Sequence, residues 1–215
     1  FNNKWETESF AVFGQSTYEF NEFWAATLGL RYTTEDKDAD LLTQPFSTAA
    51  AAATDGALVQ IAFAPVDESL SRNSDGFTGL ANLTFFMTEE TMLFTSVSTG
   101  SKSGGFNGVA GENDPREFDD EDTTNYEIGV KSQLFDNRLQ LNATVFYTEF
   151  KDLQFLAQQS VGVGTYVSNA AEGTSSGVDL NVSAAPWDFL MLSGGLQYLD
   201  AKYTDGQLDE DGFDV

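Results

Sequence analysis

The chain has 215 residues with 34 acidic and 10 basic side chains, no histidine and no cysteine, and a formal net charge of −24. The absence of histidine and cysteine excludes a Ser-His-Asp triad, histidine-ligated haem or zinc, thiolate catalysis, disulfides and cysteine-based zinc clusters. Such an acidic chain repels phosphate backbones, so we expect no nucleic-acid partner.

The aromatic content of 13% is too high for a disordered chain. No apolar run approaches the roughly 18 residues of a membrane-spanning helix, which excludes a helical membrane protein but leaves a membrane β-barrel open. The first residues, Phe1 to Lys4, lack the basic start and apolar core of a signal peptide. We therefore expect a mature chain or a piece of one.

Apolar and polar residues alternate with a period of two along most of the chain, which is the pattern of a strand with two differently solvated faces. This pattern predicts eight strands, at about 7–20, 23–36, 75–88, 91–103, 122–135, 138–157, 165–185 and 189–204. Short turns near residues 21, 89, 137 and 187 alternate with long connections at 37–74, 104–121, 158–164 and 205–215. Short turns at one rim and long loops at the other are typical of an outer-membrane β-barrel.

The alternation also predicts which way each side chain points. The side chains expected to face lipid are Leu28, Leu30, Ile128, Val130, Leu141, Val145, Leu180, Val182, Leu190 and Leu192. Those expected to face the lumen are Thr27, Arg31, Glu127, Lys131, Asn142, Thr144, Asp179 and Asn181. A soluble β-sandwich, in which the apolar face would be the core, is the alternative at this point.

Two blocks of sequence carry a resemblance to a known family. Residues 100–108 read GSKSGGFNG, and residues 123–154 read TTNYEIGVKSQLFDNRLQLNATVFYTEFKDLQ. Together with shorter blocks such as FAVFGQ at 10–15 and YLDAKY at 198–203, they closely resemble the barrel of TonB-dependent outer-membrane receptors. The resemblance extends over essentially the whole chain.

The resemblance implies an all-β, antiparallel transmembrane β-barrel of twenty-two strands, of which this chain would supply about eight. It implies a bacterial outer-membrane location, lipid around the barrel, a plug domain, contact with TonB, and uptake of a scarce nutrient such as a ferric siderophore. Neither a plug nor a TonB-binding segment is visible, so we expect residues 1–215 to be an interior slice of a larger barrel. A passive porin or a small eight-stranded structural barrel is the rival interpretation.

Candidate ligand contacts lie in the long loops. Phe106, Asn107 and Arg116 supply a ring, an amide and the single cation of an acidic stretch, so they are candidates for binding at the outer mouth. Arg31, Glu127 and Lys131 are candidates for contact with a solute in the lumen, although pairing with neighbours, water or a plug is the alternative. The alternative for Arg116 is that its positive charge only offsets the negative charges of nearby acidic residues.

Other chemistry finds little support in the sequence. The glycine-rich stretch 100–108 has neither the spacing of a P-loop nor that of a dinucleotide-binding turn. The acidic clusters 112–122 and 205–214 lack the register of an EF-hand, and we expect solvated loops there, with Ca²⁺ binding as the alternative. We therefore expect no catalytic residue, metal site or cofactor, and no enzymatic activity.

Overall fold

The computed structural model describes residues 3–43, 66–108, 114–158 and 165–205. Its strands, in chain order, are β1 (Lys4–Glu19), β2 (Trp24–Thr43), β3 (Val66–Thr88), β4 (Thr91–Lys102), β5 (Gly105–Phe106), β6 (Glu117–Phe118), β7 (Glu121–Leu134), β8 (Leu139–Gln158), β9 (Thr165–Trp187) and β10 (Leu190–Asp205). Eight of them form one antiparallel sheet in the order β1-β2-β3-β4-β7-β8-β9-β10, and β5 pairs with β6. Each long strand pairs with its neighbours along the chain, so the predicted all-β architecture of eight consecutive strands is confirmed.

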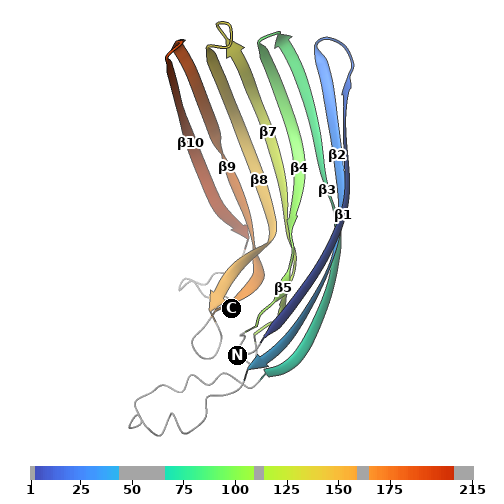
Figure 1. The fold of residues 1–215 in the computed structure, drawn as a ribbon. Helices are drawn as coiled ribbons and strands as arrows, with labels where there is room; N and C mark the ends of the chain where they lie inside the picture. The colour runs from blue at the N-terminus through green and yellow to red at the C-terminus, as the bar shows by residue number, and fades with distance from the viewer. Residues whose placement is uncertain (1–2, 44–65, 109–113, 159–164, 206–215) are drawn as a thin grey trace, which may run out of the picture.

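The four short turns lie together at one rim, at the top of Figure 1, and the long connections leave from the other rim. Local chemistry explains two of these turns. The Asn21 side chain accepts hydrogen bonds from the backbone N–H groups of Phe23 and Trp24, at 2.8 and 3.0 Å. Residues 135–137 have positive φ, which Asp136 and Asn137 tolerate better than most residues do. Turns and strands therefore follow the sequence pattern closely.

Strands β2 and β3 differ from the prediction because they run well beyond residues 36 and 75. Residues 37–43 and 66–74, which we predicted as part of a long loop, form a paired extension of this hairpin that ends at Thr43 opposite Val66. The extension carries charged side chains on both faces, so it lacks the alternation that marks the rest of each strand. Residues 44–65, 109–113, 159–164 and 206–215 of the predicted long connections lie outside the described residues.

The strand register defines two faces of the sheet, since directly opposed residues in an antiparallel pair point to the same side. The pairing traces one face of the sheet from Leu28 and Leu30 on β2, across β3 and β4, to Ile128 and Val130 on β7. The same face continues across β8 to β9. Nine of the ten side chains predicted to face lipid share this apolar face, and Leu190 lies beyond a bulge between β9 and β10. The eight side chains predicted to face the lumen share the opposite face, which we call the polar face.

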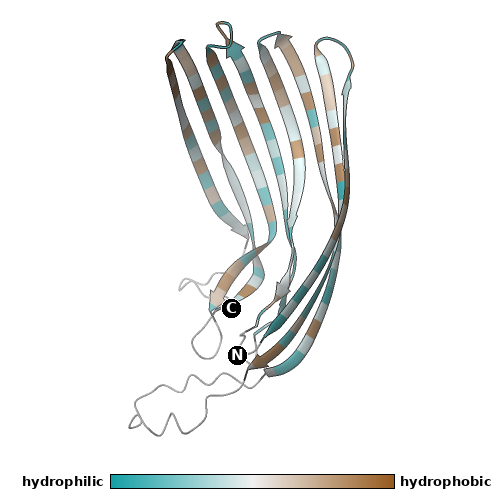
Figure 2. Cartoon of the chain, viewed as in Figure 1, coloured by the Kyte–Doolittle hydropathy of each residue, from teal (hydrophilic) through white to brown (hydrophobic). Residues whose placement is uncertain are grey.

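The apolar face is uncovered over the described residues. Large apolar side chains such as Leu28, Ile128 and Val145 are more than half exposed on it. Hydrophobic and hydrophilic residues alternate along the strands in Figure 2. A soluble sandwich would bury this face, so the exposed apolar surface favours a wall in contact with lipid. Within the described residues, no helix has the length and apolar character needed to cross a membrane.

Aromatic pairs mark two levels on the apolar face. The rings of Trp24 and Phe85 lie 4.7 Å apart near the short-turn rim. Further towards the long-loop rim lie the pairs Tyr32–Phe77, at 4.9 Å, and Tyr126–Tyr147, at 6.4 Å. Such pairs at both edges of an apolar band are typical of a membrane barrel, whose interfaces are lined by aromatic girdles.

The sheet splits at its long-loop end. The ladder between β3 and β4 stops at Leu80 opposite Ser98, although β3 continues to Val66 and β4 to Lys102. The Thr99 hydroxyl takes the place of the next backbone partner and accepts a hydrogen bond from the Gly79 N–H, at 2.9 Å. Strands β1 to β3 therefore separate from the rest of the wall beyond this point, and residues 103–108 and 114–120 lie between the two parts.

Candidate functional site

Arg31, Glu127 and Lys131 all lie on the polar face, where each contacts a neighbour in the wall. Arg31 Nε donates to Thr33 Oγ1 at 3.0 Å, and its guanidinium lies 5.8 Å from the centre of a phenylalanine ring. Glu127 accepts hydrogen bonds from Ser96 and Asn125. Lys131 Nζ lies 5.1 Å from the ring centre of Phe94. These charges therefore belong to a polar wall that already satisfies part of their hydrogen-bonding and charge requirements.

Residues 103–108 and 114–120, which we call the inward loop, fold back over the polar face at the long-loop rim. Its strands β5 and β6 pair Gly105 with Phe118 and Phe106 with Glu117. Phe106 is 6% exposed and packs against Ala39, Leu41 and Leu70. The Trp5 ring lies 6.2 Å from the Phe106 ring. The structure thus places a small hydrophobic cluster on the polar face, where it anchors the loop to β1–β3.

Asn107 joins the inward loop to the other half of the split sheet. Its Nδ2 donates to the carbonyl oxygens of Pro115 and Val167 at 3.0 and 2.9 Å, and its Oδ1 accepts from the Val167 N–H at 2.8 Å. The side chain thereby pairs with β9 as a strand residue would. Asn107 is 6% exposed and has a hydrogen bond at each side-chain polar atom, so its first role in this conformation is to position the loop.

Two further amides reinforce the attachment to the β8–β9 side. Gln154 Nε2 donates to the carbonyl oxygens of Lys102, Ser103 and Asp119, at 3.0 to 3.2 Å. Asn169 donates to the Asp119 carbonyl and accepts from the Asp119 N–H. Gln154 reaches the loop because β8 bulges between Phe150 and Phe155. The loop is consequently held from both halves of the wall.

On the opposite side, the loop is held by Lys37 and Arg72. Lys37 Nζ donates to Ser103 Oγ at 2.8 Å and to the Gly104 carbonyl at 2.6 Å. Arg72 pairs with Asp119 at 3.0 Å and with Asp120 at 3.2 Å. Only glycine fits at position 104, because a Cβ there would lie 2.3 Å from the Phe118 carbonyl oxygen and 3.1 Å from the Arg72 guanidinium carbon. The loop thus passes in direct contact with the arginine.

Glu35 completes this cluster on β2. Its carboxylate accepts a short hydrogen bond from the Ser103 hydroxyl and forms an ion pair with Lys37 at 2.9 Å. The Ser103 hydrogen bond, which has the larger effect, and the Lys37 interaction hold the pKa of Glu35 below its usual value. Partial burial acts in the opposite direction and raises the pKa. Glu35 is therefore ionised at neutral pH and ties Ser103 to the wall.

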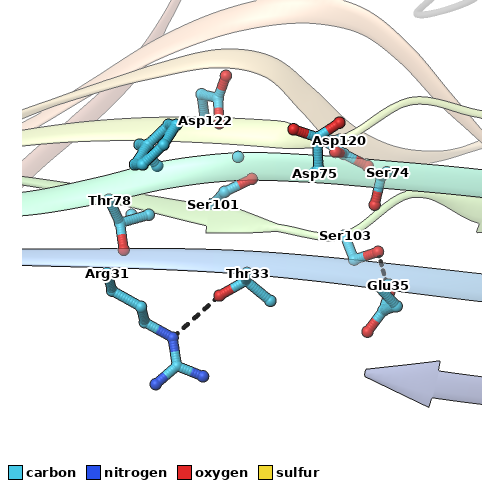
Figure 3. Close-up of a pocket in the computed structure, with 13 residues that line it drawn as sticks. Arg31, Thr33, Glu35, Ser74, Asp75, Thr78, Ser101, Ser103, Asp120 and Asp122 are labelled. Atoms are coloured by element: carbon cyan, nitrogen blue, oxygen red, sulfur yellow. Dashed lines mark hydrogen bonds between the residues drawn. The ribbon is translucent and has the colours of Figure 1, made fainter. Parts of the chain in front are cut away.

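A cleft of about 550 Å³ opens between β3 and β4 where their ladder ends. Its lining includes Arg31, Glu35 and Asp75 from β2 and β3, and Ser103 and Asp120 from the inward loop. Figure 3 shows these side chains around the cleft, with the Arg31–Thr33 and Ser103–Glu35 hydrogen bonds dashed. The cleft is polar and strongly acidic, and the sequence pattern gave no sign of it because it depends on where two strands part.

Residues 114–122 of the acidic stretch pack against the wall more than the solvated loop that we expected, and residues 112 and 113 lie outside the described residues. Asp114 and Glu121 are each 8% exposed, and Asp119 and Asp120 pair with Arg72. Arg116 forms an ion pair with Glu68 of β3, at 3.6 Å. The described residues contain no group of three or more side chains suited to hold a metal ion. Of the second acidic cluster, only Asp205 falls within the described residues.

The TonB-dependent receptor-like β-barrel family model matches residues 1–214 of the chain. The chain belongs to this family. Its members are receptors and transporters of the bacterial outer membrane, and the chain is a β-barrel segment of such a protein.

Similar proteins agree with this assignment. The siderophore receptor PiuA of Acinetobacter baumannii is 28% identical over 203 residues, which are 92% of this chain and 24% of PiuA. The metal-pseudopaline receptor CntO of Pseudomonas aeruginosa is 28% identical over 202 residues, or 94% of this chain and 25% of CntO. The chain thus spans about a quarter of the length of these relatives.

Solved structures show the same fold. The ferric yersiniabactin uptake receptor FyuA of Yersinia pestis superposes with a TM-score of 0.73 at 19% identity, covering 94% of this chain and 28% of FyuA. The crystal structure of PiuA gives a TM-score of 0.71 at 24% identity, covering 93% of this chain and 26% of that structure. The chain therefore corresponds in fold to one part of a larger receptor barrel.

Proposed function

We propose that the chain is part of the wall of an energy-coupled receptor that imports a metal chelate, with a ferric siderophore as the first candidate. The observation that carries this proposal is the family match over residues 1–214 together with relatives named as siderophore and metal receptors. The polar face and the inward loop support it, because a receptor needs a polar interior and a partly closed outer mouth.

The partners follow from the same proposal. Residues 1–215 form part of the barrel domain, and other parts of the polypeptide supply the remaining strands, the plug and the segment that contacts TonB. Outer-membrane lipid surrounds the apolar face. The wall needs no cofactor and performs no chemical conversion, since recognition and passage of a solute require only binding groups.

The candidate ligand residues take different roles within this proposal. Phe106 and Asn107 are buried against the wall, so they act on a ligand by fixing the inward loop. Arg116 lies on the same loop beside Glu68, with its side chain 23% exposed, and it is the member of the three that can reach a bound solute. The ligand therefore meets the loop that these residues hold in place.

Removing the Asn107 side chain should release the inward loop. In an Asn107→Ala variant of the intact receptor, the backbone of Val167 loses both of its hydrogen bonds to the Asn107 side chain. We therefore expect trypsin to cleave after Arg116 faster than in the parent protein. Peptide mapping over time measures this rate. Asn125→Ala is the matched control, because it removes an amide that accepts a hydrogen bond from Thr148 within the wall. Equal rates in both variants would contradict a positioning role for Asn107.

A passive pore is the rival function, and energy dependence separates the two. The intact receptor is expressed in cells that lack their own siderophore receptors, and radiolabelled ferric iron is supplied with each member of a siderophore panel. Uptake that stops when TonB is deleted supports the receptor. Diffusion of unrelated small sugars with the same rate in both backgrounds, without TonB-dependent iron uptake, would overturn the proposal in favour of a pore.

A further inference from the structure

Two cations lie directly opposite one another on the polar face. Lys37 of β2 and Arg72 of β3 are cross-strand partners, and their side chains are only 21% and 16% exposed. Like charges in this position are destabilising unless anions compensate them. The chain has just 10 basic residues against 34 acidic ones, so a pair of opposed cations stands out. Glu35 compensates Lys37 from the same strand, so the anion that Arg72 needs must come from another segment.

In the present conformation the inward loop supplies the anions that pair with Arg72. Asp119 and Asp120 each place one carboxylate oxygen on Arg72, one on each terminal guanidinium nitrogen. Asp120 also accepts from the Gly104 N–H, at 2.7 Å, and the Gly104 carbonyl accepts from Lys37. Arg72 is thus satisfied by two carboxylates of the inward loop, whereas Lys37 is paired with Glu35 of its own strand and donates to Ser103 and Gly104 of the loop.

The pairing leaves part of the arginine unused. The buried Nε of Arg72 has no hydrogen-bond partner among the described residues. Guanidinium binds a carboxylate best as a fork, with two parallel N–H groups on the two oxygens of one anion. The two loop carboxylates instead contact one terminal nitrogen each, and the Asp119 side chain is 79% exposed. A better matched anion therefore has a donor available and a weakly held competitor to displace.

We propose that Arg72, with Lys37 beside it, forms a binding site for a small carboxylate-bearing anion, and that Asp119 and Asp120 occupy Arg72 until such an anion displaces them. This inference deepens the proposed function by naming the chemical class of solute that engages the mouth. Displacing the two carboxylates removes the ion pairs that hold residues 119 and 120 on Arg72, while the Arg116–Glu68 ion pair and the Phe106–Leu70 contact still hold the loop to β3. Capture of the anion therefore loosens the loop beside Arg72.

Citrate is a suitable probe, and its uncharged trimethyl ester is the matched control ligand. Calorimetric titration of the intact receptor should show citrate binding that weakens with added salt, and no binding of the ester. Arg72→Gln should weaken citrate binding by about tenfold or more, because a charge-assisted pair is lost. Asp119→Asn with Asp120→Asn should strengthen it about five- to tenfold, because the site is no longer self-occupied.

A matched charge control is available on the other face of β1 and β2. Glu8→Gln with Asp38→Asn removes two carboxylates from the same rim, on the face away from Arg72, and should leave citrate affinity unchanged within about twofold. If the Asp119/Asp120 variant gains no more than this control, or if citrate and its ester bind alike, the proposal is overturned. The asparagine variants preserve side-chain shape, so they decide the matter even if Arg72→Gln fails to fold.

The outcomes also separate this inference from the proposed function. If TonB-dependent iron uptake persists but citrate does not bind as expected, the anion-site proposal fails and the receptor proposal stands. If citrate binds with the expected pattern but the receptor imports no iron chelate, the anion-site proposal stands and the uptake proposal fails.

Discussion

Arginine at position 130 will destabilise the folded barrel by about 2–4 kcal/mol, whereas glutamine at the adjacent position 131 will cost much less. Val130 lies on the apolar face opposite Leu93 and Ala143, midway along β7 between Tyr126 and the short turn. A charge there must enter the centre of the lipid layer or distort it. The free energy of unfolding in urea, measured for the intact receptor reconstituted in lipid, tests the difference.

Lys131→Gln is the control because it changes the neighbouring residue on the polar face. Lys131 lies opposite Met92 and Asn142 and loses only its contact with the Phe94 ring. That contact is worth on the order of 0.5–1 kcal/mol at an exposed site. Equal losses for the two substitutions would mean that the faces of β7 are assigned wrongly, since a one-residue slip exchanges them.

The strands were predictable wherever one face is apolar and the other polar. Residues 24–32 and 126–134 alternate in this way, and their strands and turns agree with the structure within a few residues. The extension of this hairpin over residues 37–43 of β2 and 66–74 of β3 was not predictable, because both faces are charged and no period remains. Pairing there is dictated by continuation of the hairpin ladder, which is a property of two segments together.

The inward loop shows a second limit of sequence reasoning. Composition drew attention to Phe106 and Asn107 as a ring and an amide available to a ligand. Their actual contacts lie far away along the chain: Phe106 packs on Ala39 and Leu41, and Asn107 bonds Val167, sixty residues on. The opposed cations Lys37 and Arg72 escaped notice for the same reason. Only the register of β2 and β3 brings them together, and no local spacing encodes that register.

Alanine at position 177 should destabilise the wall by about 1–3 kcal/mol through overpacking. A Cβ at Gly177 of β9 would lie 2.1 Å from the Tyr198 backbone oxygen on β10 and 2.8 Å from the ring of Phe146 on β8. A flexible side chain could turn away, but a carbonyl in a ladder can move only if β10 moves with it. The loss therefore falls on the pairing of three strands, and urea unfolding of the intact receptor in lipid measures it.

Gly194→Ala provides the matched control, because it makes the same change on β10 at a position where a Cβ meets no atom within 4 Å. Alanine there removes only the conformational freedom of glycine, so stability should stay the same or rise by about 0.5 kcal/mol. A tolerated Gly177→Ala would show that β9 and β10 can separate at this level. Glycine at 177 therefore sets how closely β9 approaches β10 and the Phe146 ring on β8.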